Sequence, residues 1–502
     1  MGMNPREMAA LLVKEIEESE AKDVDRSVGT VVTVGDGIAT VYGLPEAMLG
    51  ELLSFPNGGK GLVMNLNEDS LGVVLLKGAE TISEGDPVYS TGEVLEVKVG
   101  DALLGRVVSP LAEPLDELGP IDSKKKRPIE RIAPGVMERE SVSVPLETGL
   151  VAIDSMVPIG RGQRELIIGD RQTGKTSIAI DAIVNQKGKG VYCVYVAIGQ
   201  KNSSVAAIHE HLRSLGCLDY VTIVNASASQ PSPELYIAPF AGMAMAEEWM
   251  EEGKDVLIVF DDLSKHAVAY RALSLLLRRS PGREAYPGDI FYLHSRLLER
   301  ACKLSKKRGG GSITALPIVE TQAGDISSYI PTNVISITDG QIFLSADRFQ
   351  AGFRPAIDSG LSVSRVGSAA QTKAMKEASR SLKINLASYR ENLSFAQFGS
   401  DLDSGTKKIL AHGSALEAGL RQVNYAPLPM EEQVITLFAL QGGYLDGKKD
   451  EEVSSLLSEL REYAKDRASA LLADIREKKA LDEESRQKIK DLLELFFLEE
   501  KK

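Results

Sequence analysis

The sequence predicts a chain of several domains: a small N-terminal β-barrel, a central α/β domain with a mainly parallel sheet, and a C-terminal α-helical bundle. Three observations lead to this fold class. Short β-type runs separated by Gly, Asn and Pro turns fill residues 28–97. Buried strands and helices alternate from about residue 145. After Met375 the apolar residues recur with helical spacing in residues 431–440, 451–474 and 483–497, which predicts a helix over each range. The predicted domain boundaries are therefore 26–95 for the barrel, 96–372 for the α/β domain and 373–502 for the helical domain.

Residues 1–25 are predicted to form an amphipathic helix ahead of the barrel. Asn4 can cap this helix, Pro5 suits its first position, and Glu7 lies three residues after the cap. The apolar residues that then fall on one face are Met8, Leu11, Leu12 and Ile16. Such a stripe must be covered by the rest of the chain or by a partner subunit, and the residues leave both possibilities open.

The barrel is predicted from one hairpin and three further strands. Residues 28–34 and 38–42 are β-type runs that flank Gly35, Asp36 and Gly37, a strong turn signal. The further runs are 50–55, 61–66 and 71–76. Few aromatic residues occur in these strands, so we interpret the barrel as a structural or assembly module rather than a ligand-binding one.

The composition is typical of a globular chain and gives no sign of export or of a membrane span. Of the 502 residues, 43% are hydrophobic and 26% charged. No apolar run reaches the length of about 18 residues that a transmembrane helix needs. The first 22 residues lack the apolar region of a secretory signal and are rich in Glu, unlike a transit peptide. Cys193, Cys217 and Cys302 lie far apart, which indicates a reduced, cytoplasmic compartment.

The charge pattern limits the function classes. A formal net charge of −13 argues against a protein that tracks nucleic acid, because phosphate neutralisation needs a basic surface. The basic run 124–127 lies in a connecting region rich in Pro and turns, and it is predicted to be a solvated loop. His209 and His211 lack an obvious third ligand, so we interpret them as an exposed pair on a helix rather than a metal site.

The strongest motif lies in the middle of the chain, at residues 169–176, and matches G-x-x-x-x-G-K-[ST]. Glycines let such a loop curl so that successive N–H groups point at a polyphosphate. Lys175 adds a charge for the β- and γ-phosphates, and the Thr176 hydroxyl can bind Mg²⁺. A chance match is the alternative, but residues 165–168 resemble a strand and residues 177–184 a buried helix. The central domain is therefore predicted to be a P-loop NTPase domain.

A second site signal follows an apolar run downstream. Residues 191–196, 220–224 and 255–260 are apolar throughout, as in parallel strands covered by helices on both faces. The third run ends in Asp261 and Asp262. An acidic residue at the carboxyl end of such a strand holds Mg²⁺ in P-loop sites, directly or through water. Asp261 is the predicted Mg²⁺ residue, and Asp262 is expected to cap the next helix.

Several segments together resemble one known family, the alpha subunits of F-type ATP synthases. The resemblance extends over nearly the whole chain and includes the barrel, the P-loop domain and the helical domain in that order. Besides the P-loop, its most specific parts are residues 195–201, 261–265, 275–289, 360–367 and 395–401.

This resemblance implies a ring of three alpha and three beta subunits around a rotating gamma subunit, with nucleotides at all six interfaces. Sites mainly on beta would make ATP from ADP and phosphate, driven by an H⁺ or Na⁺ gradient, and would also run the reverse hydrolysis. Sites mainly on alpha would hold Mg-ATP without turnover. The helix at 1–25 would contact the delta subunit and the peripheral stalk. The complex would lie on the cytoplasmic face of the bacterial plasma membrane, and the coupling ion stays open.

Gln200 is the residue that separates a binding site from a hydrolytic one. It is expected to follow the strand next to the P-loop strand, at the carboxyl edge of the sheet. In the catalytic relative, a glutamate at the matching position polarises the attacking water. Gln cannot take a proton, and loss of a positioned base typically costs roughly 10²–10⁴ in rate. The alternative is that Gln200 is an ordinary loop amide and that the base lies elsewhere.

Arg365 is assigned by the resemblance alone, because nothing local distinguishes it among 58 basic residues. It matches the alpha-subunit arginine that enters the neighbouring beta site as an arginine finger, where its charge stabilises the γ-phosphate. The alternative is a surface or salt-bridged arginine.

The resemblance also supplies the remaining nucleotide-site residues. Phosphate and Mg²⁺ contacts are assigned to Gly169, Asp170, Arg171, Gln172, Thr173, Gly174, Lys175, Thr176 and Ser177. The adenine pocket is assigned to Phe349, Arg354, Pro355 and Gln422. After Gln422 the stretch 421–425 departs from the usual pattern of the family.

Three other classes share the P-loop core. Gln200 and the alpha-type segment around Arg365 argue against the interpretation of the chain as a catalytic beta subunit. An export ATPase would need a catalytic carboxylate and an arginine finger in one chain, which Gln200 again opposes. A hexameric RNA translocase would need a basic, aromatic-bearing N-terminal module, which the acidic, aromatic-poor chain lacks.

Overall fold

The computed structural model describes residues 27–396 and 403–499. The predicted helix at 1–25 and the family motif at 397–401 lie outside the described residues. Two compact units make up the described chain. The first is formed by the residues up to Glu96 with Pro231–Glu234 and Ala269–Pro287, and the second by the rest.

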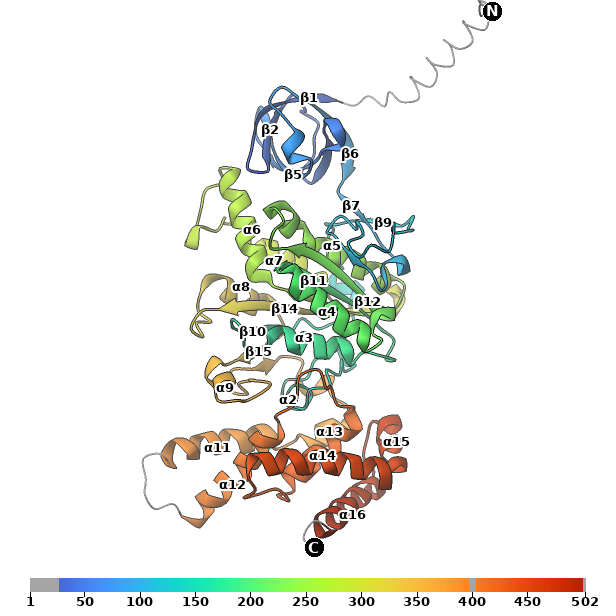
Figure 1. Cartoon of the computed structure of the whole chain (residues 1–502), viewed down its shortest axis with the longest axis vertical. Helices are drawn as coiled ribbons and strands as arrows, with labels where there is room; N and C mark the ends of the chain where they lie inside the picture. Colours follow the sequence, from blue (N-terminus) through green and yellow to red (C-terminus); the bar gives the residue numbers. More distant parts are fainter. Residues whose placement is uncertain (1–26, 397–402, 500–502) are drawn as a thin grey trace, which may run out of the picture. The chain divides into compact units, whose positions relative to one another are not determined.

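The predicted barrel is confirmed as a closed, antiparallel barrel of six strands, drawn in blue in Figure 1. Its strands follow the order β1-β2-β5-β4-β3-β6, and β6 pairs with β1 to close it. The predicted hairpin around Asp36 joins β1 to β2. The strands are β1 (Val28–Gly35), β2 (Ile38–Tyr42), β3 (Glu51–Ser54), β4 (Lys60–Leu66), β5 (Ser70–Lys77) and β6 (Pro87–Val94).

An arginine from far along the chain belongs to the barrel unit. Arg279 donates from Nη2 to the Met64 carbonyl at 2.6 Å and from Nε to Asn65 Oδ1 at 2.8 Å. It also donates from Nη1 to the Tyr270 hydroxyl at 2.7 Å. One guanidinium thus joins β4 to the segment 269–287. Arginine suits this position because its guanidinium presents several N–H donors in a fixed geometry.

The central domain contains an eight-stranded sheet that is parallel except for its β16 edge. Its strand order is β16-β15-β10-β14-β13-β11-β12-β8. The inner strands are buried along most of their length, as expected for parallel strands covered on both faces. The strands are β8 (Val107–Val108), β10 (Leu166–Asp170), β11 (Val191–Gln200), β12 (Val221–Ser227), β13 (Asp255–Asp261), β14 (Ser312–Thr321), β15 (Gly340–Leu344) and β16 (Val363–Ser364). A separate pair is formed by β7 (Glu96–Lys98) and β9 (Lys126–Pro128). The helices are α2 (Val151–Met156), α3 (Lys175–Val184), α4 (Asn202–Ser214), α5 (Ser232–Glu251), α6 (Leu263–Leu276), α7 (Ile290–Leu298), α8 (Tyr329–Ile337) and α9 (Ala346–Gln350).

The predicted neighbourhood of Gln200 is wrong in two details. Gln200 is the last residue of β11, and it does not follow that strand. Strand β11 is also not next to the P-loop strand β10, because β14 and β13 lie between them. Crossover helices allow strands from later in the chain to insert between earlier ones, so chain order does not give sheet order. Gln200 nevertheless lies at the carboxyl edge of the sheet.

The basic run 124–127 is not simply a solvated loop, because its second half forms β9 and pairs with acidic residues of α5. Arg127 contacts Glu248 at 2.5 Å and Glu251 at 2.7 Å, and Lys125 contacts Glu248 at 2.7 Å. The sequence prediction failed because the acidic partners lie more than 120 positions away. Exposed ion pairs of this kind contribute little individually, although networks contribute more.

The C-terminal region is helical as predicted, with one correction. The stretch 451–474 was expected to be one helix, but α14 ends at Arg467 and α15 begins at Ser469. Between them Ala468 has φ −133° and ψ 33°, outside the helical region. No Gly or Pro marks this break in the sequence. The helices are α10 (Lys373–Ala378), α11 (Leu382–Ala396), α12 (Ser404–Gly419), α13 (Met430–Gln441), α14 (Asp450–Arg467), α15 (Ser469–Lys478) and α16 (Glu483–Glu499).

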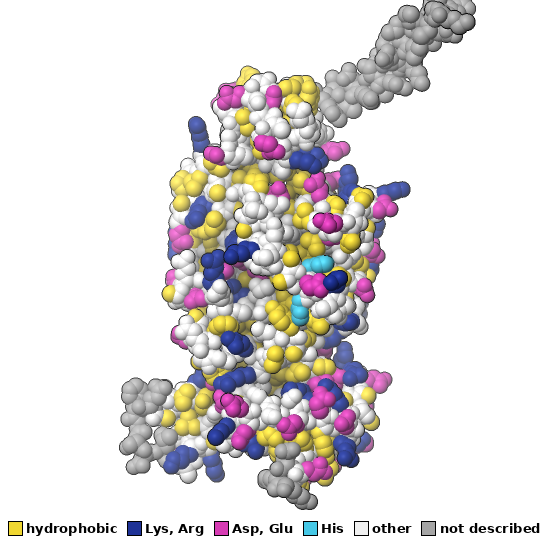
Figure 2. Space-filling model, viewed as in Figure 1, with side chains coloured by type: hydrophobic (Ala, Val, Ile, Leu, Met, Phe, Trp, Pro, Cys, Tyr) yellow, Lys and Arg dark blue, Asp and Glu magenta, His cyan; other side chains and the backbone are white. Residues whose placement is uncertain are grey.

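The surface carries both signs of charge. On the face drawn in Figure 2, basic and acidic side chains are interspersed and do not gather into a basic stripe. Within the described ranges, every helix is too short or too polar to span a bilayer.

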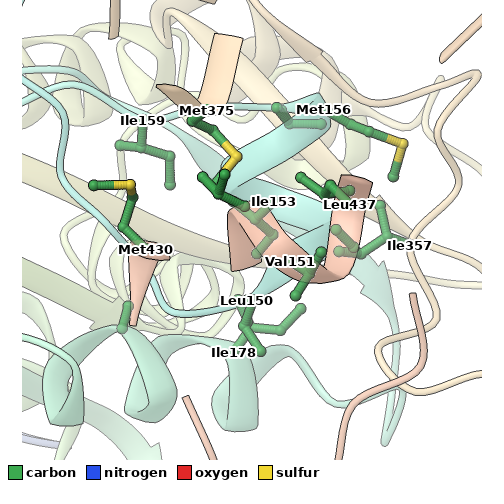
Figure 3. Packing of buried hydrophobic residues seen from close by; sticks show 14 of the residues in the cluster. Leu150, Val151, Ile153, Met156, Ile159, Ile178, Ile357, Met375, Met430 and Leu437 are labelled. Atoms are coloured by element: carbon green, nitrogen blue, oxygen red, sulfur yellow. The ribbon is translucent and has the colours of Figure 1, made fainter. Parts of the chain in front are cut away.

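One apolar core connects the sheet domain to the helical region. The short helix α2 contributes Val151, Ile153 and Met156, all nearly inaccessible to solvent. Figure 3 shows Val151 and Ile153 near Leu437 of α13, and Leu150 beside Ile178 of α3. Burial of each such side chain contributes about 1.5–3 kcal/mol. The helical region therefore supports the position of the elements that carry the P-loop.

A fully buried ion pair lies in the same unit. Arg300 and Glu247 are 1% and 0% exposed and form two parallel bonds of 2.8 Å. Arg300 also donates to the Ile129 carbonyl at 2.6 Å. Bidentate geometry of this kind offsets much of the cost of removing both charges from water.

We expect Glu247→Leu to lower the free energy of unfolding by about 3–5 kcal/mol, because it leaves the Arg300 charge buried and unpaired. The double variant Glu247→Leu/Arg300→Met is expected to recover most of this loss. Chemical denaturation of the two variants and of the single control Glu252→Gln measures the effect. A single variant as stable as the control would contradict this account.

Candidate nucleotide site

The P-loop has the conformation that its sequence predicts. Strand β10 ends at Asp170 and helix α3 begins at Lys175. Between them Gln172 and Gly174 have positive φ angles of 62° and 94°. Gly174 adopts this conformation without steric cost, whereas Gln172 is held in it by the loop. The loop therefore ends at the N-terminus of α3, where unsatisfied N–H groups and the helix dipole favour an anion.

Asp170 anchors the loop to the neighbouring strand. Its carboxylate accepts hydrogen bonds from the Thr321 hydroxyl at 2.5 Å and from the Gly324 N–H at 2.9 Å. Its carbonyl accepts from the Thr173 hydroxyl at 2.8 Å. The Asp170 carboxylate is thus directed to the end of β14, where it fixes the loop's position.

The Lys175 ammonium is held at the base of the loop. Its Nζ donates to the carbonyls of Gly169 at 2.9 Å and Asp170 at 2.6 Å. Burial lowers the pKa of Lys175, and the charges of Glu320, Asp262, Asp261 and Asp170 oppose that shift. A buried ammonium whose hydrogen bonds in the described chain go to two neutral carbonyls is suited to bind a polyphosphate.

Asp261 is the centre of the hydrogen-bond network beside the loop. Its Oδ2 accepts from the Thr176 hydroxyl at 2.7 Å and from the Tyr195 hydroxyl at 2.8 Å. Its Oδ1 accepts from Gln200 Nε2, also at 2.8 Å. Burial, and then the charge of Asp261, raise the pKa of Tyr195 well above its usual value, so the phenol stays a donor. The structure thus brings together three residues that the sequence analysis selected and adds Tyr195, which it missed.

Asp262 has the helix-capping position that was predicted for it. Its Oδ1 accepts from the Lys265 N–H at 2.8 Å, at the start of α6. Its Oδ2 lies 3.1 Å from the Lys265 ammonium. Burial raises the pKa of Asp262 to about 6, and the Lys265 charge limits the rise.

One pocket joins the phosphate-binding loop to the residues assigned to adenine. Its lining includes Thr173, Gly174 and Ser177 from the loop and the start of α3, and also Phe349, Arg354, Pro355 and Gln422. The Arg354 guanidinium lies 4.8 Å from the centre of the Phe349 ring. This pair presents a flat surface against which a planar base can stack.

Gln422 supports the wall of this pocket. Its Oε1 accepts from the Val151 N–H at 3.1 Å, and its Nε2 donates to the carbonyls of Gly149 and Ala426 at 2.8 Å each. Its own N–H donates to the Arg354 carbonyl at 2.8 Å. The side-chain amide therefore holds the segment 421–426 against the sheet domain.

The sequence analysis missed two polar residues of this pocket, Asp181 and Asn424. Asp181 lies in α3 and is only 2% exposed. Burial raises its pKa to about 7, and a hydrogen bond from the Tyr425 backbone opposes the rise. The signal was present in the sequence, because Asp181 is the one charged residue in the apolar helical run 177–184.

Arg365 lies away from this pocket. It follows β16, where Ser364 pairs with Gly340. Gly169 of the P-loop pairs with Leu344, at the other end of β15. Four residues of a strand separate these ends by about 13 Å. Arg365 is exposed, and within the described chain its recorded hydrogen bond is that of its N–H to the Asp339 carbonyl.

Comparison with known proteins agrees with this architecture. Three family models match the chain in order: the ATP synthase alpha/beta family beta-barrel domain at residues 24–92, the nucleotide-binding domain at 149–364, and the C-terminal domain at 371–496.

Curated relatives extend the likeness to almost the full chain. An ATP synthase subunit alpha from Staphylococcus epidermidis is 58% identical over 481 residues, which cover 96% of each chain. One from Staphylococcus haemolyticus is 59% identical over 477 residues and covers 95% of each chain. One from Syntrophomonas wolfei is 56% identical over 491 residues and covers 97% of each chain. The chain belongs to the alpha subunits of F-type ATP synthases.

The family model of the nucleotide-binding domain covers residues 149–364, and this range contains the P-loop. The resemblance stated from the sequence is thereby confirmed at the level of the family.

We expect Asp181→Asn to stabilise the alpha subunit increasingly as the pH rises. The Asp181 carboxyl has a pKa of about 7 in the folded chain, above the usual 3.8. Between these two pH values the unfolded chain has already lost this proton while the folded chain keeps it. The free energy of unfolding of the wild-type chain therefore falls as the pH rises through this window. The advantage of the variant should grow by about 1.4 kcal/mol for each pH unit in that window and then level off. Thermal denaturation of both chains at pH 5, 6, 7 and 8 measures it. An advantage that stays constant over this range would contradict the assignment.

Proposed function

We propose that this alpha subunit holds Mg-ATP at its own P-loop without hydrolysing it and supplies Arg365 to the catalytic site of a neighbouring beta subunit. The observation that carries the proposal is the hydrogen bond of the Gln200 amide to Asp261 at the carboxyl edge of the sheet. An amide there can bind and orient, but it cannot accept a proton from water.

The pocket residues fit ATP on chemical grounds. The loop N–H groups, Lys175 and Ser177 would contact the phosphates, and the stacked pair of Phe349 and Arg354 would contact the base. Arg171 and Gln172 are exposed at the top of the loop, where they would contact the phosphates from outside.

Thr176 and Asp261 fit Mg²⁺, because both present oxygen atoms and lie 2.7 Å apart. Within the described ranges, no cluster of three or more His, Cys, Asp or Glu could hold a metal. The ion would therefore take most of its ligands from phosphate and water, with Asp261 acting through water. When bound it would neutralise phosphate charge.

The carboxylates around Lys175 support a site without a general base. Asp170 is bonded to the end of β14, Asp261 has donors on both oxygens, and Asp262 caps α6. Glu320 lies 4.0 Å from Arg171. None of these carboxylates occupies the position of Gln200 at the end of β11.

The place of Arg365 supports action on another chain's nucleotide. It lies at the amino end of β15, about 13 Å along the strand from the position that contacts the P-loop. The charge of Arg365 acts on the buried Glu165: burial raises the pKa of Glu165 well above its usual value, and the charges of Lys383 and Arg365 oppose that shift. An exposed guanidinium of this kind is available to an adjacent subunit.

The assembly that follows is an alternating ring of three alpha and three beta subunits around a gamma rotor. Residues 1–25 would contact the delta subunit and the peripheral stalk. The complex would couple an H⁺ or Na⁺ gradient to ATP synthesis, and the chain would be peripheral to the plasma membrane on its cytoplasmic face. The interspersed charges in Figure 2 and the net charge of −13 give no support to an RNA translocase.

One assay of the purified chain separates these functions. We expect tight ATP binding without turnover, with or without RNA. ATP hydrolysis by the isolated chain would favour an export-type ATPase, and stimulation by RNA would favour a translocase.

We expect Arg365→Ala to lower the turnover of a reconstituted alpha–beta–gamma complex by roughly 10³-fold or more, because the γ-phosphate loses a fixed charge. Size-exclusion chromatography should show unchanged assembly, and nucleotide binding to the alpha P-loop should persist. The exposed Arg213→Ala serves as the matched control and should retain full turnover. Full turnover of the Arg365 variant would exclude the finger role.

We expect Gln200→Glu alone not to create an alpha site that hydrolyses ATP at the rate of the complex. The new carboxylate would face Asp261, whose charge would hold it away or protonated. Hydrolysis is measured in the complex after the beta sites are inactivated by substitution. Turnover at the wild-type rate from the alpha site would show that Gln200 is the single block to hydrolysis.

A further inference from the structure

The exposed Arg365 follows a very short strand at the edge of the sheet. Strand β16 contains two residues, and its Ser364 pairs with Gly340 of β15. A strand of this length supplies few ladder hydrogen bonds, so the backbone beside Arg365 needs other anchors. The segment 163–165, which directly precedes the P-loop strand β10, provides them.

A buried glutamine amide holds the residue before Arg365. Gln163 is 0% exposed, and its Nε2 donates to the Ser364 hydroxyl at 3.1 Å and to Glu165 Oε2 at 2.7 Å. Its Oε1 accepts from the Gly160 N–H at 2.8 Å. The amide therefore uses both of its donors and its acceptor oxygen, which fixes its orientation.

The Ser364 hydroxyl connects this amide to the backbone on both sides of Arg365. Its Oγ donates to the Pro158 carbonyl at 2.7 Å and accepts from the Gly367 N–H at 3.2 Å. The Arg365 N–H itself donates to the Asp339 carbonyl at 2.8 Å. These bonds fix the backbone of Arg365 while its side chain stays exposed.

A second anchor comes from the residue between Gln163 and Glu165. Arg164 donates from its N–H to Asp339 Oδ2 and from Nη2 to Asp339 Oδ1, at 2.9 Å each. Arg164 also forms a parallel bridge with Ala315, so this segment is extended and Gln163 and Glu165 share the opposite face. Three consecutive residues thus hold both groups that contact the backbone at Arg365.

Glu165 is a costly residue at this position. It is buried, its Oε1 has no hydrogen-bond partner among the described residues, and burial raises its pKa well above the usual value. The charge of Asp339 adds to that shift, and the charges of Lys383 and Arg365 oppose it. Its carboxyl lies against Gly340, where an added Cβ would be 2.6 Å from Oε2. Apolar residues of similar size are often at least as stable in such places, so stability alone does not explain a carboxyl here.

We propose that Gln163 is a positioning residue for Arg365: its amide holds the Ser364 hydroxyl, and Glu165 holds the amide. The inference rests on the proposed role of Arg365 at the nucleotide of a neighbouring beta subunit. A displacement of about 1 Å at a group that acts on the reacting atoms can cost roughly 10²-fold in rate. Loss of the bond between Gln163 and Ser364 should therefore lower turnover and leave nucleotide binding unchanged.

The test compares two variants that each remove one buried glutamine amide. Gln186→Met is the matched control for Gln163→Met, because Gln186 is 1% exposed and its amide donates to the carbonyls of Glu147 and Ala182. Both variants should lower the thermal stability of the alpha subunit. In the reconstituted alpha–beta–gamma complex, Gln163→Met should lower kcat by about tenfold to a hundredfold with an unchanged KM for ATP, and Gln186→Met should keep the wild-type kcat.

Two further variants keep the test decisive if Gln163→Met does not assemble. Ser364→Ala removes the hydroxyl and should lower kcat to a similar extent, whereas Ser364→Thr keeps a hydroxyl in a residue suited to strands and should restore most of it. Glu165→Leu removes the buried acid, so thermal stability should stay the same or rise while kcat falls. Added to Arg365→Ala, Ser364→Ala should leave the residual turnover unchanged, because the positioned group is already absent.

The outcomes distinguish this inference from the proposed function. Full turnover of Arg365→Ala would overturn the proposed role of Arg365 and this inference with it. Loss of turnover in Arg365→Ala, together with a wild-type kcat in Gln163→Met or Ser364→Ala, would overturn this inference alone. Equal losses of kcat in Gln163→Met and Gln186→Met would also overturn it, because they would show a general effect of removing a buried amide.

Discussion

The arrangement of the nucleotide site depends on the buried carboxylate of Asp261. It is 2% exposed, and an unpaired charge at such a position would be strongly destabilising. Its oxygens are satisfied by Thr176 from α3 and by Tyr195 and Gln200 from β11. These bonds therefore set the position of the P-loop helix relative to two sheet strands. The same bonding holds the Gln200 amide, the group on which the proposed absence of hydrolysis rests.

Local features of this site were predictable from the sequence, and long-range ones were not. The P-loop at 169–176 and the acidic end of β13 are encoded within a few residues, because turn glycines and apolar runs act locally. The position of β11 two strands away from β10 depends on how the crossovers pack, and no local pattern specifies it. Tyr195 was missed for the same reason, since its hydroxyl finds Asp261 across 66 positions of the chain.

The difference between local and long-range features also explains why the sequence predictions for residues 451–474 and 124–127 were wrong. Helical periodicity runs through 451–474 without a Gly or Pro, so the break at Ala468 reflects packing of α14 and α15 on their neighbours. In the sequence, Lys125 and Arg127 belong to a run that is typical of a solvated loop. In the structure, both form ion pairs with Glu248 of α5. Asp181 differs from these two cases, because a charged residue within the apolar run 177–184 can be recognised in the sequence. The sequence does not show, however, that Asp181 lines the pocket.

The two ends of β15 offer different chemistry. At one end Leu344 pairs with Gly169, beside the loop that binds phosphate. At the other, Gly340 pairs with Ser364, and the exposed Arg365 follows. An arginine side chain spans about 7 Å, which is short of the roughly 13 Å that separates the ends. This separation agrees with the proposal that Arg365 acts on the nucleotide of another subunit. In the proposed ring, each chain would bind a nucleotide at one edge and present its arginine to the next chain at another.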